Sequence, residues 1–176
     1  YTARIKGCDE GILVFRQAID ANFNNKPLQA KLQYKIARTY QDQKLYEKAA
    51  AEYLFYTQAY PAQAAAISFP LEQAYFLAVS NFYNARNYRN TLLYADTSLL
   101  AFPESDYASK LVMYKGLAKL GLGQYAGSRE DFASVIKRAP ETNEALLART
   151  QIGKSHFDER NYQEAVTIFE ELLAVR

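Results

Sequence analysis

The chain has one histidine, His156, and one cysteine, Cys8, the residue types that most often carry protons, attack substrates or bind metals. One residue of each type cannot form an internal disulfide or a metal cage. No acid or nucleophile is spaced to pair with His156, so the sequence predicts a packing role for this side chain. Cys8 is predicted to be a small apolar filler.

Two other patterns could suggest chemistry. Gly121-Leu-Gly123 resembles part of a phosphate-binding loop, but it lacks the preceding strand and the lysine that such a loop requires. The pattern instead predicts the end of a helix and the opening of a turn. The acidic pairs Asp9-Glu10 and Glu170-Glu171 are predicted to lie on solvated helix faces. We therefore expect no catalytic residue, no cofactor and no metal, and predict that the chain is not an enzyme.

The composition limits the partners that the chain could bind. Its 176 residues include 21 Lys and Arg and 19 Asp and Glu, a balance that does not favour nucleic-acid binding. No apolar run approaches the ~20 residues that span a bilayer. The chain starts at Tyr1 without a targeting segment, so we interpret it as a piece of a longer protein. The cysteine count leaves the compartment open.

A short sequence motif that begins with tyrosine recurs along the chain. Its four copies begin at Tyr46, Tyr88, Tyr125 and Tyr162, which lie 42, 37 and 37 residues apart. A small residue follows three positions later, and a proline follows fifteen positions after the first three copies, at Pro61, Pro103 and Pro140. Because proline cannot continue a helix, each motif that is followed by proline predicts one helix that ends shortly before that proline.

A second helical pattern precedes each tyrosine motif, with apolar and small residues three and four positions apart. Each unit is therefore predicted to be helix A, a short turn, helix B and a turn, and the short connections make neighbouring helices antiparallel. No strand is predicted. The predicted organisation is a single domain, 1–176, with a partial repeat at 1–25 and full repeats at 26–63, 64–105, 106–142 and 143–176.

Helix starts are also predicted. Ser68 and Pro70 mark the start of helix A in the second full repeat. Ser105 and Thr142 are predicted to cap the next two A helices, with Asp106 and Glu144 in the first turns.

These residues resemble the tetratricopeptide repeat family, whose pattern places aromatic, small and proline residues at fixed positions. The first repeat carries Ile36-Ala37, Tyr40, Ala49, Tyr53 and Pro61, and the fourth carries Ile152-Gly153, Ala165 and Phe169. The third repeat departs from the pattern, with Lys115 and Lys119 at apolar positions, and the second has Val79 for a small residue. The resemblance covers essentially the whole chain and implies an all-α, right-handed α-solenoid of antiparallel hairpins.

The resemblance also implies a function, because the A helices of the family line a concave surface that binds proteins or peptides. The corresponding partner-binding residues here are Lys31, Tyr34, Arg38, Gln41, Gln73, Phe76, Tyr83, Asn84, Lys110, Met113, Lys154 and Phe157. Such a surface suits a peptide with apolar anchors and some acidic character. The alternative is that many of these residues pack between repeats. The clamp that binds chaperone-tail carboxylates is rejected, because only Lys110 matches it.

Three functions remain open for the sequence. The leading hypothesis is a scaffold or adaptor segment, and the alternatives are a structural spacer or self-assembly segment and a regulatory domain attached to an enzyme elsewhere. The turn sequences at Tyr60-Pro61, Phe102-Pro103 and Ala139-Pro140 resemble those of bacterial envelope repeat proteins. This resemblance favours the bacterial periplasm or cell envelope over the cytoplasm.

The two ends of the chain are predicted to expose apolar side chains. Ile12, Leu13 and Phe15 lie in the partial repeat, and Ile168, Leu172, Leu173 and Val175 lie in the last helix. Because stacked repeats bury their apolar faces against neighbours, such ends could drive weak homo-oligomer formation.

Overall fold

The structure is a computed structural model that describes the backbone of residues 2–63 and 68–174 and the side chains of residues 9–63 and 70–174. The Cys8 side chain and Val175 lie outside this description. Every regular element of the described residues is helical, and no strand occurs among them. The α-helices are α1 (Thr2–Ala21), α2 (Lys26–Asp42), α3 (Tyr46–Ala59), α4 (Ser68–Asn84), α5 (Tyr88–Ala101), α6 (Ala108–Gly121), α7 (Tyr125–Arg138), α8 (Asn143–Asp158) and α9 (Tyr162–Ala174).

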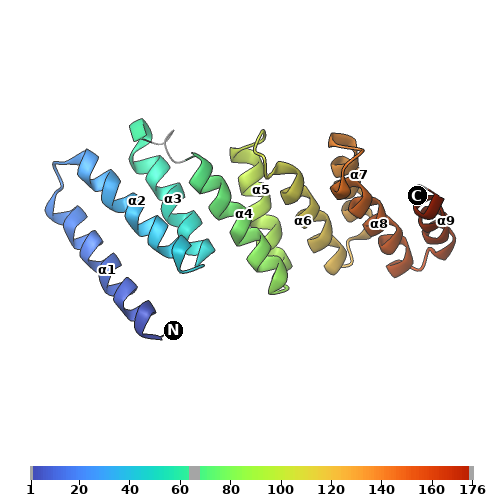
Figure 1. The fold of residues 1–176 in the computed structure, drawn as a ribbon, viewed down its shortest axis with the longest axis horizontal. Helices are drawn as coiled ribbons and strands as arrows, with labels where there is room; N and C mark the ends of the chain where they lie inside the picture. Colours follow the sequence, from blue (N-terminus) through green and yellow to red (C-terminus); the bar gives the residue numbers. More distant parts are fainter. Residues whose placement is uncertain (1, 64–67, 175–176) are drawn as a thin grey trace. The chain divides into compact units, whose positions relative to one another are not determined.

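The chain forms two compact units, Tyr1–Ala78 and Val79–Arg176, whose boundary falls within α4. In the first unit, α1 packs on α2 and α2 packs on α3. In the second unit, each helix from α5 to α9 packs on the next one, and α6 also contacts α8. Neighbouring helices within each unit are joined by short turns and run antiparallel (Figure 1). The single domain predicted for 1–176 stays a prediction.

The four repeated tyrosines mark the starts of helices. Tyr46, Tyr88, Tyr125 and Tyr162 are the first residues of α3, α5, α7 and α9, which are the predicted B helices. The predicted A helices are α2, α4, α6 and α8, and each lies within the range expected for its repeat. The prediction of an all-α fold of stacked helical hairpins is confirmed.

The four turns from helix A to helix B share one backbone conformation. Each has a single residue with positive φ, at Lys44 (62°), Arg86 (57°), Gly123 (72°) and Arg160 (69°). The next N–H then donates to a carbonyl five residues back, as from Leu45 to Tyr40 (2.9 Å) and from Asn161 to His156 (2.8 Å). This pattern closes the end of a helix. It also gives His156 the same place in its repeat as Tyr40, in agreement with the predicted packing position.

The helix starts agree with the sequence in two cases of three. α4 begins at Ser68 as predicted, and the Thr142 side chain caps α8 by accepting the N–H of Ala145 at 3.2 Å. The predicted cap at Ser105 is wrong. Its hydroxyl accepts the N–H of Tyr107 (3.1 Å) and its carbonyl accepts the N–H of Ala108 (2.9 Å), so Ser105 closes a turn before α6 begins.

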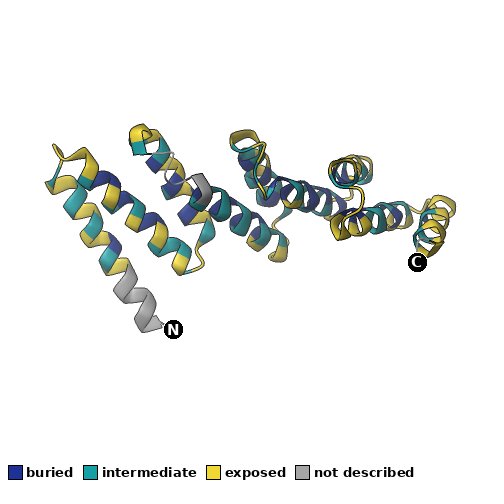
Figure 2. Cartoon of the chain, turned by 45° about the horizontal axis from the view of Figure 1, so that its top comes forward, coloured by how far each residue is buried: buried dark blue, intermediate teal, exposed yellow. Residues whose placement is uncertain are grey.

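Small residues let the helices of one hairpin approach closely. A Cβ added to Gly116 would lie 2.6 Å from Cε1 of Phe132, and one added to Gly153 would lie 2.7 Å from Cε1 of Phe169. These distances are too short for any real contact, so both rings require glycine opposite them. The buried side chains follow the faces that neighbouring helices turn toward each other (Figure 2). Ring packing therefore explains the small residues at these positions of helix A.

The two lysines that depart from the family pattern are explained by ion pairs. Lys119 lies 2.8 Å from Asp131 Oδ2 on α7, and Lys115 pairs with Asp96 on α5. Both lysines are largely buried along their length, with side-chain exposures of 23% and 20%. The aliphatic stem of lysine can cover apolar surface while its ammonium group reaches a carboxylate. Lysine therefore replaces an apolar residue here without loss of packing.

Candidate protein-binding surfaces

A group of tyrosines lies on the A helices of the second unit. The Tyr83 ring of α4 lies 5.4 Å from the Tyr114 ring of α6 and 6.0 Å from the Tyr88 ring of α5, measured between centroids. The Tyr114 hydroxyl and Ser80 Oγ are 3.0 Å apart, within hydrogen-bond distance. These contacts bring the start of α5 and two A helices together around Tyr83. Tilted ring pairs at such distances are favourable beyond their buried area.

Lys154 extends this group to a third A helix, α8. Burial is the main cause that raises the pKa of Tyr83, with smaller contributions from Tyr88 and Tyr114, whereas the Lys154 ammonium acts in the opposite direction. Lys154 is therefore close enough to Tyr83 to affect its pKa. Its own ion pair is with Asp158, at 2.7 Å. We call Ser80, Tyr83, Tyr88, Tyr114 and Lys154 the tyrosine face.

The first unit contains a cavity of about 510 Å³ beside α2 and α3. We call it the α2–α3 cavity. Its volume falls in the range of ~300–1,000 Å³ that is typical of ligand pockets. Its lining is Pro27, Leu28, Ala30, Lys31, Tyr34, Tyr56 and Gln63. The lining is thus mainly apolar and aromatic, with one cation.

The aromatic wall of this cavity is part of a longer series of rings. Tyr34 lies 5.9 Å from Tyr53 and 6.2 Å from Tyr56, and Tyr56 lies 5.5 Å from Tyr60. Lys26 Nζ lies 5.9 Å from the centre of the Tyr60 ring. Burial raises the pKa of Tyr56 and of Tyr60, which keeps both phenols neutral. The aromatic side chains of the wall are therefore uncharged, and Lys31 is the cation among the described lining residues.

The structure joins some of the predicted binding residues by hydrogen bonds. Gln41 accepts a hydrogen bond from the Tyr53 hydroxyl (2.8 Å) and donates one to Gln73 Oε1 (2.8 Å), which links α2 to α4 within the first unit. Arg38 is exposed and lies 3.9 Å from Asp42 one turn later. Lys31 and Tyr34 line the cavity described above.

Other predicted binding residues lie apart from these contacts. Met113 is only 7% exposed and belongs to the core cluster of Val112, Phe132, Val135 and Ala148. Phe157 is 57% exposed and lies against Tyr162, with ring centroids 5.5 Å apart. Asn84 and Lys110 are exposed, and Phe76 is half-buried. Met113 is therefore a packing residue in this structure, whereas the exposed side chains are accessible to a partner.

The sequence reasoning missed several residues of these surfaces. Tyr114, Tyr56, Tyr60 and Lys26 were not among the predicted partner-binding residues. The signal that could have identified Tyr56 is its position three residues after Tyr53, where the other repeats carry the aliphatic or small residues Ser98, Val135 and Leu172. A large ring at that position changes the shape of the surface next to Tyr34.

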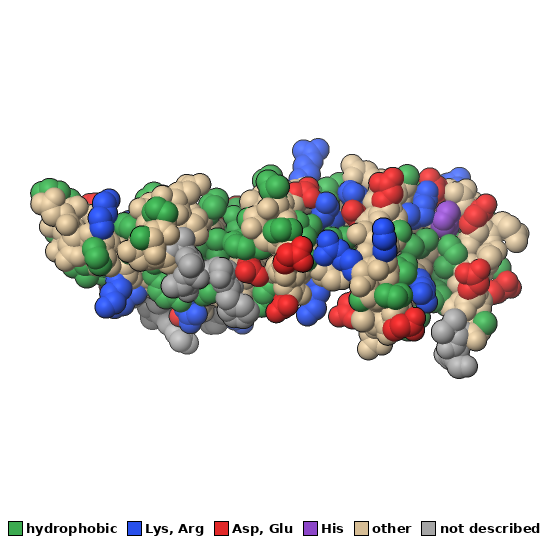
Figure 3. Space-filling model, turned by 90° about the horizontal axis from the view of Figure 1, so that it is seen from above, with side chains coloured by type: hydrophobic (Ala, Val, Ile, Leu, Met, Phe, Trp, Pro, Cys, Tyr) green, Lys and Arg blue, Asp and Glu red, His purple; other side chains and the backbone are tan. Residues whose placement is uncertain are grey.

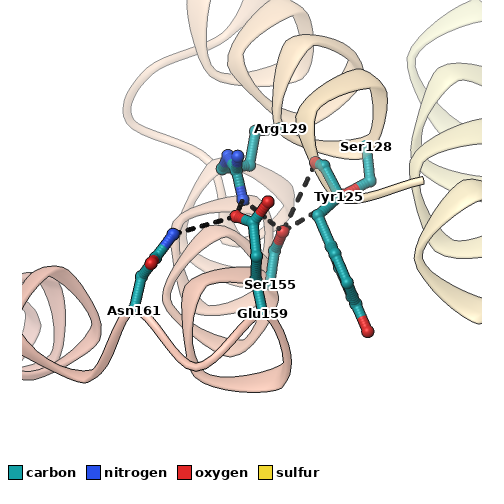
Figure 4. Close-up of polar contacts among 6 residues, drawn as sticks. All are labelled: Tyr125, Ser128, Arg129, Ser155, Glu159 and Asn161. Carbon is teal, nitrogen blue, oxygen red and sulfur yellow. Dashed lines mark hydrogen bonds and ion pairs between the residues drawn. The ribbon is translucent and has the colours of Figure 1, made fainter. Parts of the chain in front are cut away.

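A polar network holds α8 on α7 (Figure 4). Arg129 Nη1 donates to Glu159 Oε2 at 2.7 Å and to Ser155 Oγ at 3.1 Å. Asn161 also donates to Glu159 Oε2, at 3.0 Å. Ser155 is completely buried, and its hydroxyl lies 3.4 Å from the Tyr125 carbonyl. The network satisfies buried polar groups and fixes the position of α8, which carries Lys154.

Three further findings concern surface charge, metal ligands and membrane-spanning helices. Acidic and basic side chains are interspersed over the second unit on the face seen in Figure 3. Within residues 9–63 and 70–174, no three His, Cys, Asp or Glu side chains are arranged to hold a metal ion. No helix in the described part of the chain is long and apolar enough to cross a membrane.

Stacked hairpins with a repeated turn and paired small and aromatic residues define an α-solenoid. A family model described as tetratricopeptide repeat matches residues 115–174. The resemblance to this family is therefore confirmed over these residues. No curated protein matches the sequence of the chain.

Solved structures with the same fold are similar over nearly the whole chain. MamA residues 41-end from Desulfovibrio magneticus RS-1 is 12% identical, with a TM-score of 0.56, and the match covers 93% of this chain and 94% of that one. YrrB, described as a TPR protein with an unusual peptide-binding site, is 11% identical (TM-score 0.58; 99% and 80% covered). A putative kinesin light chain from Podospora anserina with TPR-like repeats is 12% identical (TM-score 0.55; 98% and 88% covered). At this identity the likeness establishes the fold alone.

Proposed function

We propose that the chain is a protein-interaction module that binds a protein or peptide partner through its A helices. The observation that carries the proposal is the tyrosine face, where side chains of α4, α6 and α8 contact or influence one another around Tyr83. Partly exposed aromatic rings beside a cation provide binding energy and specificity. They offer no nucleophile paired with a base, so we propose recognition rather than catalysis. The peptide-binding site named for YrrB is consistent with this use of the fold.

The A helices suit recognition because each contributes side chains that its own hairpin does not bury. Arg38 on α2 and Lys154 on α8 are both exposed, and each forms an ion pair with an acid one turn later on the same helix. Pairs of this kind stabilise a helix by only about 0.3–0.5 kcal/mol, so a partner carboxylate could replace the acid at little cost. An acidic residue in the partner is therefore expected to contact these helices.

Selection from a displayed library of random peptides would test this proposal. The immobilised wild-type chain should enrich a set of related peptides, and Arg38→Glu or Lys154→Glu should weaken their binding by about tenfold, which corresponds to about 1.4 kcal/mol. Lys137→Glu is the matched control, because Lys137 is an exposed lysine of the same unit as Lys154 but on the B helix α7. Absence of enrichment, or equal losses for all three variants, would contradict the proposal and favour a spacer.

A second candidate function is self-assembly, which one observation favours. A groove of about 270 Å³ lies along α8 and α9, lined by Arg149, Ile152, Ile168, Glu171 and Leu172. The neighbouring Leu173 is 64% exposed. An exposed apolar surface between stacked helices can pack on another copy. Sedimentation velocity should then reveal concentration-dependent association that Leu172→Gln with Leu173→Gln reduces and Lys154→Glu does not. Association that is insensitive to the leucine variants would exclude this groove.

A further inference from the structure

The α2–α3 cavity has the features of a pocket for one side chain of a ligand. Its aromatic wall consists of the rings of Tyr34 and Tyr56, and Pro27, Leu28 and Ala30 are also part of the lining. Tyr56 is 5% exposed and contacts Tyr60, which is 6% exposed, so this wall is held in place by packing. A rigid apolar wall lowers the entropy lost on binding. An aromatic or large aliphatic side chain is the group that such a cavity accommodates best.

The charge around the cavity has one sign. Lys31 lines it, and Lys26 lies over the ring of Tyr60, which contacts Tyr56 of the lining. No carboxylate is among the lining residues that the structure describes, and Asp42 and Glu52 of the same unit are paired with Arg38 and Arg16. The other acids of this unit are also absent from the described lining. No described lining residue therefore offsets the charge of Lys31 within the cavity. A ligand with carboxylates next to its anchor is therefore complementary to this site.

We propose that the α2–α3 cavity binds an acidic peptide segment by accepting one of its apolar or aromatic side chains, with Lys26 and Lys31 contacting the flanking carboxylates. This inference rests on the proposed function and specifies the chemical class of the partner and the place of its anchor. Lys31 provides an ammonium group in the lining, and Tyr34 provides the ring against which the anchor packs. A basic segment with the same anchor would place like charges next to Lys31 and should be rejected.

The chain contains no tryptophan, which allows a direct assay. A tryptophan in a probe peptide can be excited without excitation of the tyrosines, and its emission moves to shorter wavelength when the ring leaves water. The probes are acetyl-Glu-Glu-Trp-Glu-Glu-amide, its counterpart with four lysines, and the acidic peptide with alanine in place of tryptophan as an unlabelled competitor. We expect saturable binding of the acidic tryptophan probe, weakening as salt rises, no binding of the basic probe, and little competition by the alanine peptide.

Charge reversals at the cavity locate the binding site. Lys31→Glu should weaken binding of the acidic probe about tenfold, and Lys26→Glu should also weaken it. Lys35→Glu is the control, because Lys35 is an exposed lysine of the same helix that lies over the Phe15 ring and does not line the cavity. Tyr34→Ser should also weaken binding. Because this variant removes packing against Tyr53, its helix content is checked first, and the two exposed lysines carry the test if it fails to fold.

The possible outcomes separate this inference from the proposed function. Equal binding of acidic and basic probes, no binding of the acidic probe, or equal losses for Lys31→Glu and Lys35→Glu would overturn the acidic pocket. If peptides from the displayed library still bound and lost affinity in Lys154→Glu, the proposed function would stand without the pocket. If no library peptide bound and the acidic probe still bound through Lys31, the inference would stand, and partner recognition would be limited to the α2–α3 cavity.

Discussion

At the scale of single residues, glycine has two opposite roles in this chain. Gly116 and Gly153 lie against the rings of Phe132 and Phe169, where a methyl group has no room. Gly127 lies within α7, and the nearest atom to its added Cβ is Cδ of Lys119 at 3.4 Å, an ordinary contact with a flexible side chain. Glycine inside a helix costs stability relative to alanine when no contact requires it. The same substitution should therefore change stability in opposite directions at these positions.

Alanine substitutions measure this difference. Gly116→Ala should lower the free energy of unfolding by about 1–3 kcal/mol, because the Phe132 ring is fully buried and cannot move aside. Gly153→Ala should cost less, since Phe169 is half-buried. Gly127→Ala should raise the free energy of unfolding by about 0.5–1 kcal/mol. Urea denaturation of the three variants checks this, and a loss at Gly127 equal to that at Gly116 would contradict the packing described here.

At the scale of elements, the turn from helix A to helix B has one geometry with different residues at its left-handed position. Three repeats place a lysine or arginine there, and the third repeat places Gly123. A residue with a Cβ pays about 1–2 kcal/mol in this conformation, whereas glycine does not. The tight turn between helices is therefore maintained by the hydrogen bonds that close the helix ends, even where the residue is strained.

Substitutions at the left-handed position of the turn should reveal the cost of placing a side chain there. Gly123→Arg should lower the free energy of unfolding by about 1 kcal/mol, and Arg160→Gly should leave it unchanged or raise it by up to about 1 kcal/mol. The added side chain has space, because no atom lies within 4 Å of a Cβ built on Gly123. Thermal unfolding followed by circular dichroism measures both variants. A stabilising Gly123→Arg would show that the turn does not have the positive φ described.

The elements were predictable from the sequence, and the exposure of their faces was not. Tyrosine at the start of each B helix and the following proline are local signals, so the helices begin where the sequence predicted. Met113 has the helical position of a surface residue, yet it is buried, because α7 and α8 cover that side of α6. The hydroxyl of Ser105 could cap a helix or close a turn, and only the following backbone decides. Contacts between repeats, such as Tyr114 with Ser80, depend on the stacking of helices and not on spacing alone.

At the scale of the whole molecule, buried tyrosines link stability to alkaline pH. Burial is the main cause that raises the pKa of Tyr56, Tyr60, Tyr75 and Tyr83 above the usual 10.0. These phenols occur in both units. A group whose pKa is higher in the folded state holds its proton longer there than in the unfolded chain. Its contribution to stability is complete below pH 10 and is lost as the pH rises through the folded pKa.

We therefore expect the helices to unfold at alkaline pH, together with ionisation of the tyrosines. Titration upward from neutral pH should show loss of helical circular dichroism starting above about pH 10, with tyrosinate absorbance rising at the same pH. Tyr60→Phe should move the midpoint of unfolding to higher pH, because it removes a buried phenol whose ionisation favours the unfolded chain. Tyr162→Phe is the control, since the Tyr162 side chain is 55% exposed. Ionisation of all tyrosines near pH 10 with the helices intact would contradict their burial.

The central claim is that partners bind through the A helices, and mapping of a bound peptide tests it most directly. The isotope-labelled chain is titrated with a peptide selected from the displayed library, and backbone amide shifts are followed by nuclear magnetic resonance. The largest changes are expected in α2, α4, α6 and α8, around Tyr34, Tyr83 and Tyr114, and they should be lost in Lys154→Glu for peptides that contact the tyrosine face. Changes concentrated on the outward faces of α3, α5, α7 and α9 would contradict the claim.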